Sequence, residues 1–141
     1  MRLRLGGLVC VAVVAGCTAD TGDRLELVAG AHRIDAEIAD TPASRATGLM
    51  HRATLAANQG MLFVYPQSGR HCMWMRNTLL PLSVAFLDED GDVINIAEMA
   101  PRSDTQYCPS APARYALEMN AGWFQQHGIG AGMRVRIKET P

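Results

Sequence analysis

The stretch Pro81–Met99, PLSVAFLDEDGDVINIAEM, decides the fold because it holds two β-rich runs on either side of DEDGD. Asp90-Gly91 in the middle of DEDGD favours the tight turn of a β-hairpin. The stretch therefore predicts two antiparallel strands that are joined at residues 88–92.

Alternation of apolar and polar residues predicts further strands on both sides of this hairpin. In residues 133–138, MRVRIK, the alternation places Met133, Val135 and Ile137 inward. The other predicted strands are HRIDAEIAD (32–40), GMLFVYP (60–66), CMWMRN (72–77) and RYALEMN (114–120).

Two short helices complete the expected set of elements. Thr41 is a suitable N-cap and Pro42 suits the first helical position. One face of that helix is predicted to comprise Ala46, Leu49, Met50 and Ala53. A second helix is expected at about residues 122–127. We count about seven strands, so we expect a mainly β fold with one or two short helices, in a small single-domain barrel-like or sandwich-like architecture.

The N-terminus has the pattern of a bacterial secretory signal. Arg2 and Arg4 precede an apolar run at residues 8–15, which is too short to span a bilayer as a mature helix. The run ends in VAGC (14–17), which resembles a lipoprotein lipobox. That resemblance implies cleavage before Cys17 and attachment of lipid to it. The alternative is an ordinary signal peptide that happens to contain cysteine.

The lipobox divides the chain into a signal peptide (1–16), a lipidated cysteine with a polar tether (17–24) and one β-rich domain (25–141). The resemblance implies a membrane-anchored protein of the cell envelope that faces the periplasm, and Thr18 after the cysteine favours the outer membrane. Without residues 1–16 the chain has 13 − 2 = 11 basic and 14 acidic residues, a net charge near −3. A mildly acidic chain without basic runs argues against nucleic-acid binding.

The four cysteines have separate expected roles. Cys10 leaves with the signal and Cys17 carries lipid, so Cys72 and Cys108 remain as a pair in an oxidising compartment. A disulfide between them closes a loop of roughly 37 residues, which the chain-entropy model values at about 4 kcal/mol. The alternative is a free thiolate at Cys72 that acts as a metal ligand or nucleophile.

Five blocks of sequence carry a family resemblance: RATGLMHR, GMLFVYP, WMRNTLLPLSVAFLDEDGDVI, PARYALEMNAGWF and GIGAG. Their order and spacing resemble domain-of-unknown-function family 192, also called uncharacterised protein family 0127, over about residues 26–138. The block from Trp74 to Thr78, followed by Pro81, is the most specific. The resemblance implies a small β-rich envelope protein and implies no activity, cofactor or catalytic residues.

Catalytic motifs are absent from the sequence, so we predict no catalytic residues. There is no GxSxG nucleophile elbow, and a Cys72–His127 nucleophile pair loses its thiolate if the disulfide forms. An envelope hydrolase is kept as an alternative function.

The run HCMWM (71–75) contains a histidine, a cysteine and two methionines, all of which are soft-metal ligand types. Met73 and Met75 alternate like core residues, in which methionine is ordinary filling. We therefore predict no metal and no cofactor, and copper binding remains an alternative.

Polar and aromatic residues cluster at two predicted strand ends. The candidate cleft residues are Trp74, Arg76, Asn77, Thr78, Glu118, Asn120 and Trp123. If the two ends meet, they form a cleft that suits a carbohydrate or peptide ligand or an envelope protein. In the alternative, the asparagines satisfy buried backbone groups and Arg76 pairs with Glu118. The sequence thus favours a non-catalytic binding or assembly module.

Overall fold

The hairpin predicted from residues 81–99 is present. β4 (Leu82–Leu87) and β5 (Val93–Met99) pair antiparallel, and every residue of β4 is buried. In the turn, one carboxylate oxygen of Asp88 accepts hydrogen bonds from the backbone N–H groups of Asp90 and Asp92, both at 2.9 Å. This side-chain turn, together with a φ of +83° at Gly91, reverses the chain.

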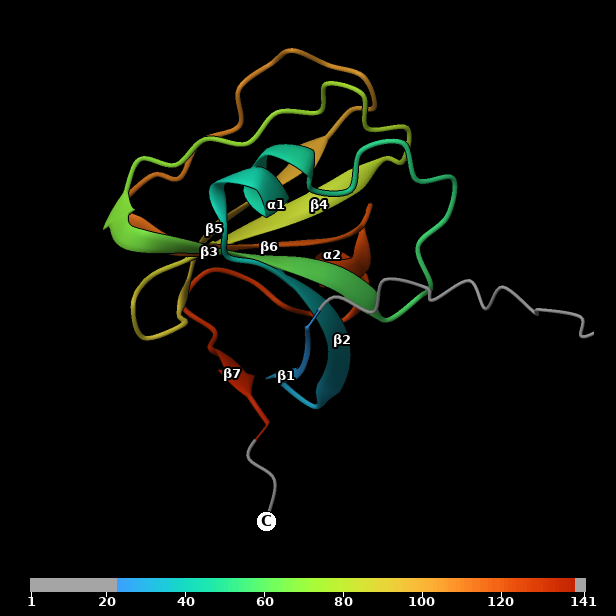
Figure 1. Ribbon diagram of the computed structural model, residues 1–141. Coiled ribbons are helices and arrows are strands. Elements are labelled where there is room, and N and C mark those ends of the chain that lie inside the picture. Colours follow the sequence, from blue (N-terminus) through green and yellow to red (C-terminus); the bar gives the residue numbers. More distant parts are fainter. Residues whose placement is uncertain (1–22, 139–141) are drawn as a thin grey trace, which may run out of the picture.

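The computed structural model describes residues 23–138, in which seven strands form one curled sheet (Figure 1). The sheet order is β5-β4-β6-β3-β2-β1-β7, and the pair β2–β3 is parallel while the other pairs are antiparallel. The remaining elements are β1 (Arg24–Ala29), β2 (His32–Ala39), α1 (Pro42–Thr47), β3 (Gln59–Gly69), β6 (Ala113–Asn120), α2 (Trp123–Gln126) and β7 (Val135–Ile137). The protein is mainly β with two short helices, as predicted.

The sheet curls far enough for its last strand to meet the central hairpin. The backbone N–H of Val135 donates to the carbonyl of Gly91 at 2.9 Å, and that of Val93 donates to Met133 at 2.8 Å. A Cβ at Gly91 would lie 2.5 Å from the Val135 oxygen, so this approach requires glycine. These contacts give the sheet the form of a half-barrel.

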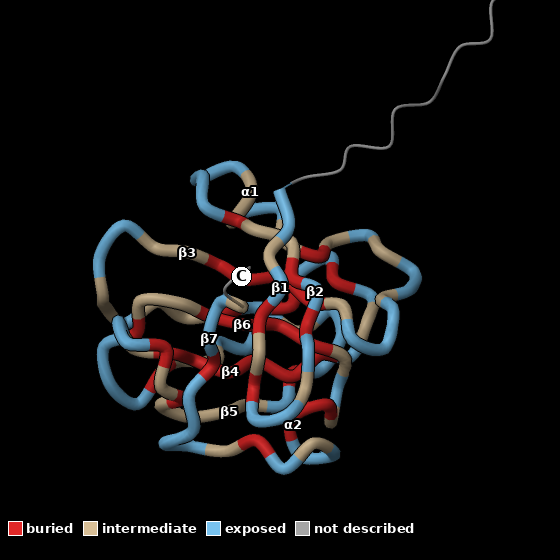
Figure 2. The backbone as a smooth tube through the Cα atoms, turned by 90° about the horizontal axis from the view of Figure 1, so that it is seen from below, coloured by how far each residue is buried: buried red, intermediate tan, exposed pale blue. Residues whose placement is uncertain are grey.

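Both faces of the sheet are covered, and buried residues run along its central strands (Figure 2). On β6, Leu117 packs in the core shared with β1, β2, β7 and α2, whereas Ala116 packs in the core on the opposite face. In Figure 1, α1 and the connections 70–81 and 100–112 lie over that opposite face. Within residues 23–138, no helix is long and apolar enough to cross a membrane.

Residues 72–77 do not form the predicted strand. Met73 makes an isolated bridge to Tyr107, with N–H···O distances of 2.7 and 2.9 Å, and Asn77 turns the chain with a φ of +56°. The alternation in the sequence is nevertheless real, because Met73 and Met75 are buried while Trp74 is exposed. The alternation correctly predicts which side chains are buried. It does not show that the segment pairs with a loop instead of a sheet strand.

The first helix is shorter than its apolar spacing predicts. Thr41 caps it as predicted, in a reciprocal capping box with Ser44, but the helix ends at Thr47 because Gly48 turns with a φ of +48°. Leu49 is buried beyond the end of the helix. The predicted face is otherwise wrong, since Ala46 and Ala53 are exposed and Met50 is only partly buried.

The prediction that Met133 and Ile137 point inward is also wrong. Met133 and Ile137 are exposed, and only Val135 of the predicted inward set is buried. β7 pairs with β1 alone over three residues, so its inward face is short. β1 itself occupies residues to which we assigned no element.

Candidate functional site

A small pocket opens on the face of the sheet that α1 covers. It lies between the end of α1, strands β3 and β6, and the segment 72–78, and its volume is about 80 Å³. The residues that line it are Arg45, Ala46, Thr47, Gly48, Leu49, Met50, Phe63, Tyr65, Cys72, Met73, Trp74, Thr78 and Glu118. Three of the predicted cleft residues therefore meet here.

Glu118 is the unusual member of this pocket because its side chain is buried and only 3% exposed. Its carboxyl projects from the middle of β6, where its backbone pairs with Met61 and Val84 on the neighbouring strands. Among residues 23–138, no group donates a hydrogen bond to this carboxyl and no cation pairs with it. Burial raises the pKa of Glu118 to about 8, so the carboxyl holds its proton at neutral pH.

Tyr65 forms a second polar wall of the pocket. Its hydroxyl donates to the Met73 sulfur at 3.3 Å. The His71 ring stacks on the Tyr65 ring, with 3.9 Å between the ring centres. Burial, together with the nearby Glu118 carboxylate, raises the pKa of Tyr65 to about 12 against the opposing effect of Arg45. The hydroxyl is therefore a neutral donor or acceptor at physiological pH.

The Arg45 side chain fixes the wall of the pocket by donating to two backbone carbonyls. One guanidinium nitrogen donates to the carbonyls of Asp40 at 2.6 Å and Val64 at 2.9 Å, and the guanidinium carbon lies 5.5 Å from the centre of the Tyr65 ring. This arrangement joins α1 to the residue after β2 and to the middle of β3. It also places a fixed positive charge beside the pocket.

The rim is formed by an exposed tryptophan. Trp74 is 44% exposed, and the Arg76 guanidinium lies 4.2 Å from the centre of its ring. Arg76 in turn forms an ion pair with Asp104 at 2.9 Å. The predicted alternative in which Arg76 pairs with Glu118 is therefore wrong, because the arginine points to the rim and the acid lies below it.

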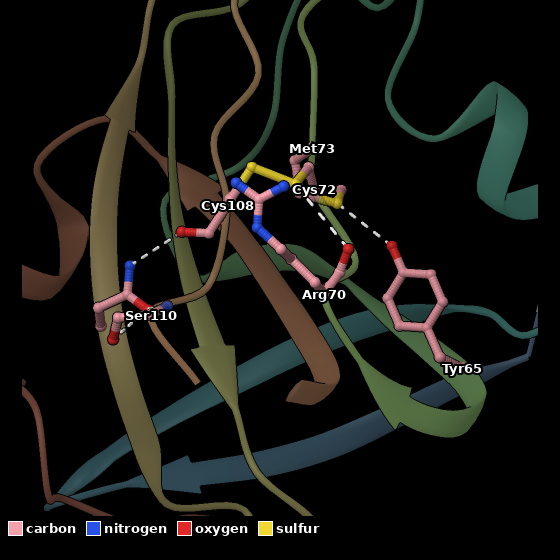
Figure 3. Close-up of a disulfide and its surroundings, with 7 residues drawn as sticks. Tyr65, Arg70, Cys72, Met73, Cys108 and Ser110 are labelled. Carbon is pink, nitrogen blue, oxygen red and sulfur yellow. Dashed lines mark hydrogen bonds between the residues drawn. A yellow bond between two sulfur atoms is a disulfide. The ribbon is translucent and has the colours of Figure 1, made fainter. Parts of the chain in front are cut away.

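The predicted disulfide between Cys72 and Cys108 is present (Figure 3). It joins the segment that carries Trp74 to the connection between β5 and β6. The carbonyl of Cys108 accepts a hydrogen bond from the Asn95 side chain at 3.4 Å. Because Cys72 also lines the pocket, the bond holds the rim in place.

The other predicted cleft residues lie elsewhere. Asn77 is exposed, and its carbonyl accepts from the backbone N–H of His51. Asn120 donates to the carbonyls of Leu55 and Ala56 at 2.9 and 3.2 Å, which is the structural role that we considered as an alternative. Trp123 is buried in the core on the other face of the sheet.

Sequence reasoning missed Arg45 and Tyr65. The signal for Glu118 was visible, because it is an acid inside the apolar alternation of RYALEMN. Arg45 and Tyr65 carry no comparable signal, since arginine on a short helix and tyrosine near a strand end are ordinary surface and packing residues.

The described residues offer little to a metal ion. No group of three or more histidine, cysteine, aspartate or glutamate side chains gathers among residues 23–138. Met50 and Met73 line the pocket, but the neighbouring Cys72 is oxidised and His71 hydrogen-bonds the Gln67 carbonyl at 2.8 Å. The disulfide likewise removes the nucleophile from the conceivable Cys72–His127 pair.

A larger pocket, of about 650 Å³, lies where β7 approaches the hairpin turn. Three of its five charged residues have partners: Arg134 binds Asp92 through two hydrogen bonds, Lys138 pairs with Glu26 and Glu89 accepts from Ser68. The other two, Asp90 and Arg136, form no ion pair within residues 23–138. The larger pocket lacks a buried titratable group comparable to Glu118. We therefore take the smaller pocket as the candidate site.

Fold and pocket together define a small β-rich single-domain protein with a buried acid beneath an aromatic rim. The chain belongs to the DUF192 family, described as "Uncharacterized ACR", whose profile matches residues 25–137. This agrees with the resemblance seen in the sequence. No curated protein matches the chain.

Two solved structures are similar to this protein along most of its length. One is a protein of unknown function from Novosphingobium aromaticivorans DSM 12444, with 32% identity and a TM-score of 0.80, covering 93% of this chain and 99% of that one. The other is a candidate transcription regulator from Sinorhizobium meliloti 1021, with 34% identity and a TM-score of 0.76, covering 81% and 92%.

Proposed function

We propose that this protein is a lipid-anchored binding module of the cell envelope and that the pocket above Glu118 is its ligand site. The observation that carries the proposal is a buried carboxyl, 3% exposed, that borders a pocket and has no partner among the described residues. The carboxyl oxygens are not among the fully buried side-chain atoms without a partner, which within residues 23–138 comprise Arg114 Nε alone, so they stay open to the pocket. A ligand that enters the pocket can pair with the carboxyl, which favours recognition over a purely structural role.

The composition of the pocket favours binding over hydrolysis. Glycoside hydrolysis uses a pair of carboxyl groups, and Glu118 is the one acid among the residues that line the pocket. Cys72 is oxidised, so no thiolate is present to act as a nucleophile. A proton-holding acid, a tyrosine hydroxyl and a threonine hydroxyl are instead suited to hold a ligand by hydrogen bonds.

We expect Glu118→Leu to weaken ligand binding strongly while the domain stays folded, because leucine fits an apolar interior without an unpaired acid. The full chain, extracted in detergent, is titrated with envelope materials one class at a time: soluble cell-wall fragments, lipopolysaccharide, soluble phospholipid headgroups and peptides. At least one class should bind, with affinity at least about tenfold weaker for Glu118→Leu, which is about 1.4 kcal/mol.

Glu98→Gln is the matched control, because Glu98 is an exposed acid on β5 that accepts from Ser83 and does not line the pocket. It should bind like the unchanged protein. Failure of all four classes to bind, or equal binding by Glu118→Leu, would contradict the proposed function.

The anchor is a separate prediction, since Cys17 lies outside the described residues. Cys17→Ser should prevent lipid attachment, so labelled palmitate should be incorporated into the unchanged protein and not into the variant. Cell fractionation should then find the unchanged protein in the membrane. Release of soluble mature protein from the unchanged chain, insensitive to inhibition of the lipoprotein signal peptidase, would contradict the anchor.

Nucleic acid is not among the ligands that we propose, although one similar protein is named a candidate transcription regulator. Several basic residues on the surface are neutralised by acids: Arg24 by Asp35, Arg134 by Asp92, and Arg52 by Glu37, whose carboxylate it contacts through two hydrogen bonds. Such pairing argues against the basic surface that phosphate backbones require.

A further inference from the structure

We infer that the pocket above Glu118 receives the acetamido group of an N-acetylated amino sugar, whose ring lies against Trp74. This inference rests on the proposed function and names the class of ligand. It is carried by the charges around the pocket, by the pocket's size and lining, and by the exposed indole at its rim.

The charges around the pocket favour a neutral ligand. A cationic group would meet the guanidinium of Arg45 in the wall and that of Arg76 at the rim. An anionic group would give up its hydration in a pocket whose wall guanidinium, that of Arg45, already donates to two backbone carbonyls. A carboxyl that keeps its proton offers one donor and one acceptor, and a neutral amide offers the complementary acceptor and donor. An amide is therefore the group that satisfies the buried acid without bringing charge into the pocket.

The size and the walls of the pocket fit a small amide with a methyl group. Its volume of about 80 Å³ exceeds the roughly 10–15 Å³ that a single water requires, yet it is too small for a whole sugar ring. Leu49, Phe63 and Met73 provide apolar lining, and burial of a methyl group against them is favourable. A hydroxyl alone would leave this apolar lining without a partner.

The rim provides a surface for the rest of the ligand. Trp74 lines the pocket and is 44% exposed, although tryptophan is usually well buried. The Arg76 guanidinium lies over one face of the indole, 4.2 Å from the ring centre, so a sugar ring would lie against the other face. Exposed aromatic rings of this kind pack against the apolar C–H face of a sugar ring, whereas a peptide has no such flat face beside each amide.

The test compares three disaccharides that differ only in the substituent at C2 of each ring. The full chain in detergent is titrated with N,N′-diacetylchitobiose, with chitobiose, in which the amines are free, and with cellobiose, in which they are replaced by hydroxyls. We expect the diacetylated sugar to bind, as measured by calorimetry and tryptophan fluorescence, and the other two to bind at least about tenfold more weakly. Equal binding of cellobiose and the diacetylated sugar would overturn the inference.

Two pairs of variants assign the contacts. Glu118→Gln keeps a donor and an acceptor, so it should bind the diacetylated sugar within about threefold of the unchanged protein, whereas Glu118→Leu should bind it much more weakly. Trp74→Ala should weaken binding at least about tenfold, whereas Leu79→Ala, at a similarly exposed apolar residue that does not line the pocket, should leave it unchanged. Equal effects of Trp74→Ala and Leu79→Ala would overturn the sugar assignment.

Different experimental results would contradict this inference and the proposed function. If the sugar does not bind but acetylated peptides or another envelope class do, and Glu118→Leu strongly weakens that binding, the acetamido-sugar inference is wrong and the binding function stands. If no class binds, both are wrong.

Discussion

Replacing both Cys72 and Cys108 by alanine should lower the free energy of unfolding by about 2–4 kcal/mol. The two residues lie 36 positions apart, so their bond restricts a large part of the unfolded chain. The chain-entropy model gives about 4 kcal/mol for such a loop, and measured losses are often smaller. Urea denaturation of the double variant and of the unchanged protein, both without reductant, measures the difference.

The loss should be concentrated around the pocket. The segment 72–78 is held to the opposite connection by four backbone hydrogen bonds: two between Met73 and Tyr107, one from Met75 to Ser103 and one from Arg102 to Thr78. Without the disulfide, hydrogen exchange should therefore quicken at residues 72–78 and 103–108 more than in β4 or β6. Thr105→Ala, in the same connection, is the control and should change neither quantity. Full stability in the double variant, with free thiols in the unchanged protein, would contradict the prediction.

The central hairpin was predictable because its signals are local. Asp90-Gly91 and the two β-rich runs lie within nineteen consecutive residues, and turn chemistry acts between neighbours. The capped start of α1 at Thr41 was predictable for the same reason. The position of β7 was harder, because its exposure depends on its pairing with β1 and on how far the sheet curls, and neither is encoded in its own alternation.

The candidate site divides in the same way. Glu118 was a candidate because an acid within an apolar strand is a local anomaly, and Trp74 because it stands beside polar residues. Arg45 and Tyr65 reach the pocket through the parallel β2–α1–β3 connection, which brings residues of separate elements together. Asn120 and Trp123 follow Glu118 closely in sequence, yet one binds a loop and the other packs in the opposite core. Residues that are close in sequence can therefore pack on opposite faces of the sheet.

Glu118 should make the protein less stable as the pH rises, and Glu118→Gln should remove this dependence. In the folded state the pKa is raised to about 8, against 4.5 for an ordinary glutamate. Between these values the unfolded chain has released the proton and the folded chain still holds it, so the free energy of unfolding falls with rising pH. The contribution of Glu118 to the free energy of unfolding is greatest below about pH 4.5. It decreases as the pH rises to about 8 and is constant above that.

The size of the effect follows from the width of this window. Each pH unit contributes about 1.4 kcal/mol, so the unchanged protein should lose about 3 kcal/mol relative to Glu118→Gln between pH 5.5 and pH 8.5, measured by urea denaturation of both at each pH. Other shifted groups act outside this range. Asp35, Glu37 and Asp92 have a pKa lowered by their arginine partners, so they titrate at more acidic pH, and the pKa of Tyr65 lies at about 12. A constant difference between the two proteins across this range would show that the Glu118 carboxyl is ionised in the folded state, and would require a cation or a hydrogen-bond donor beside it.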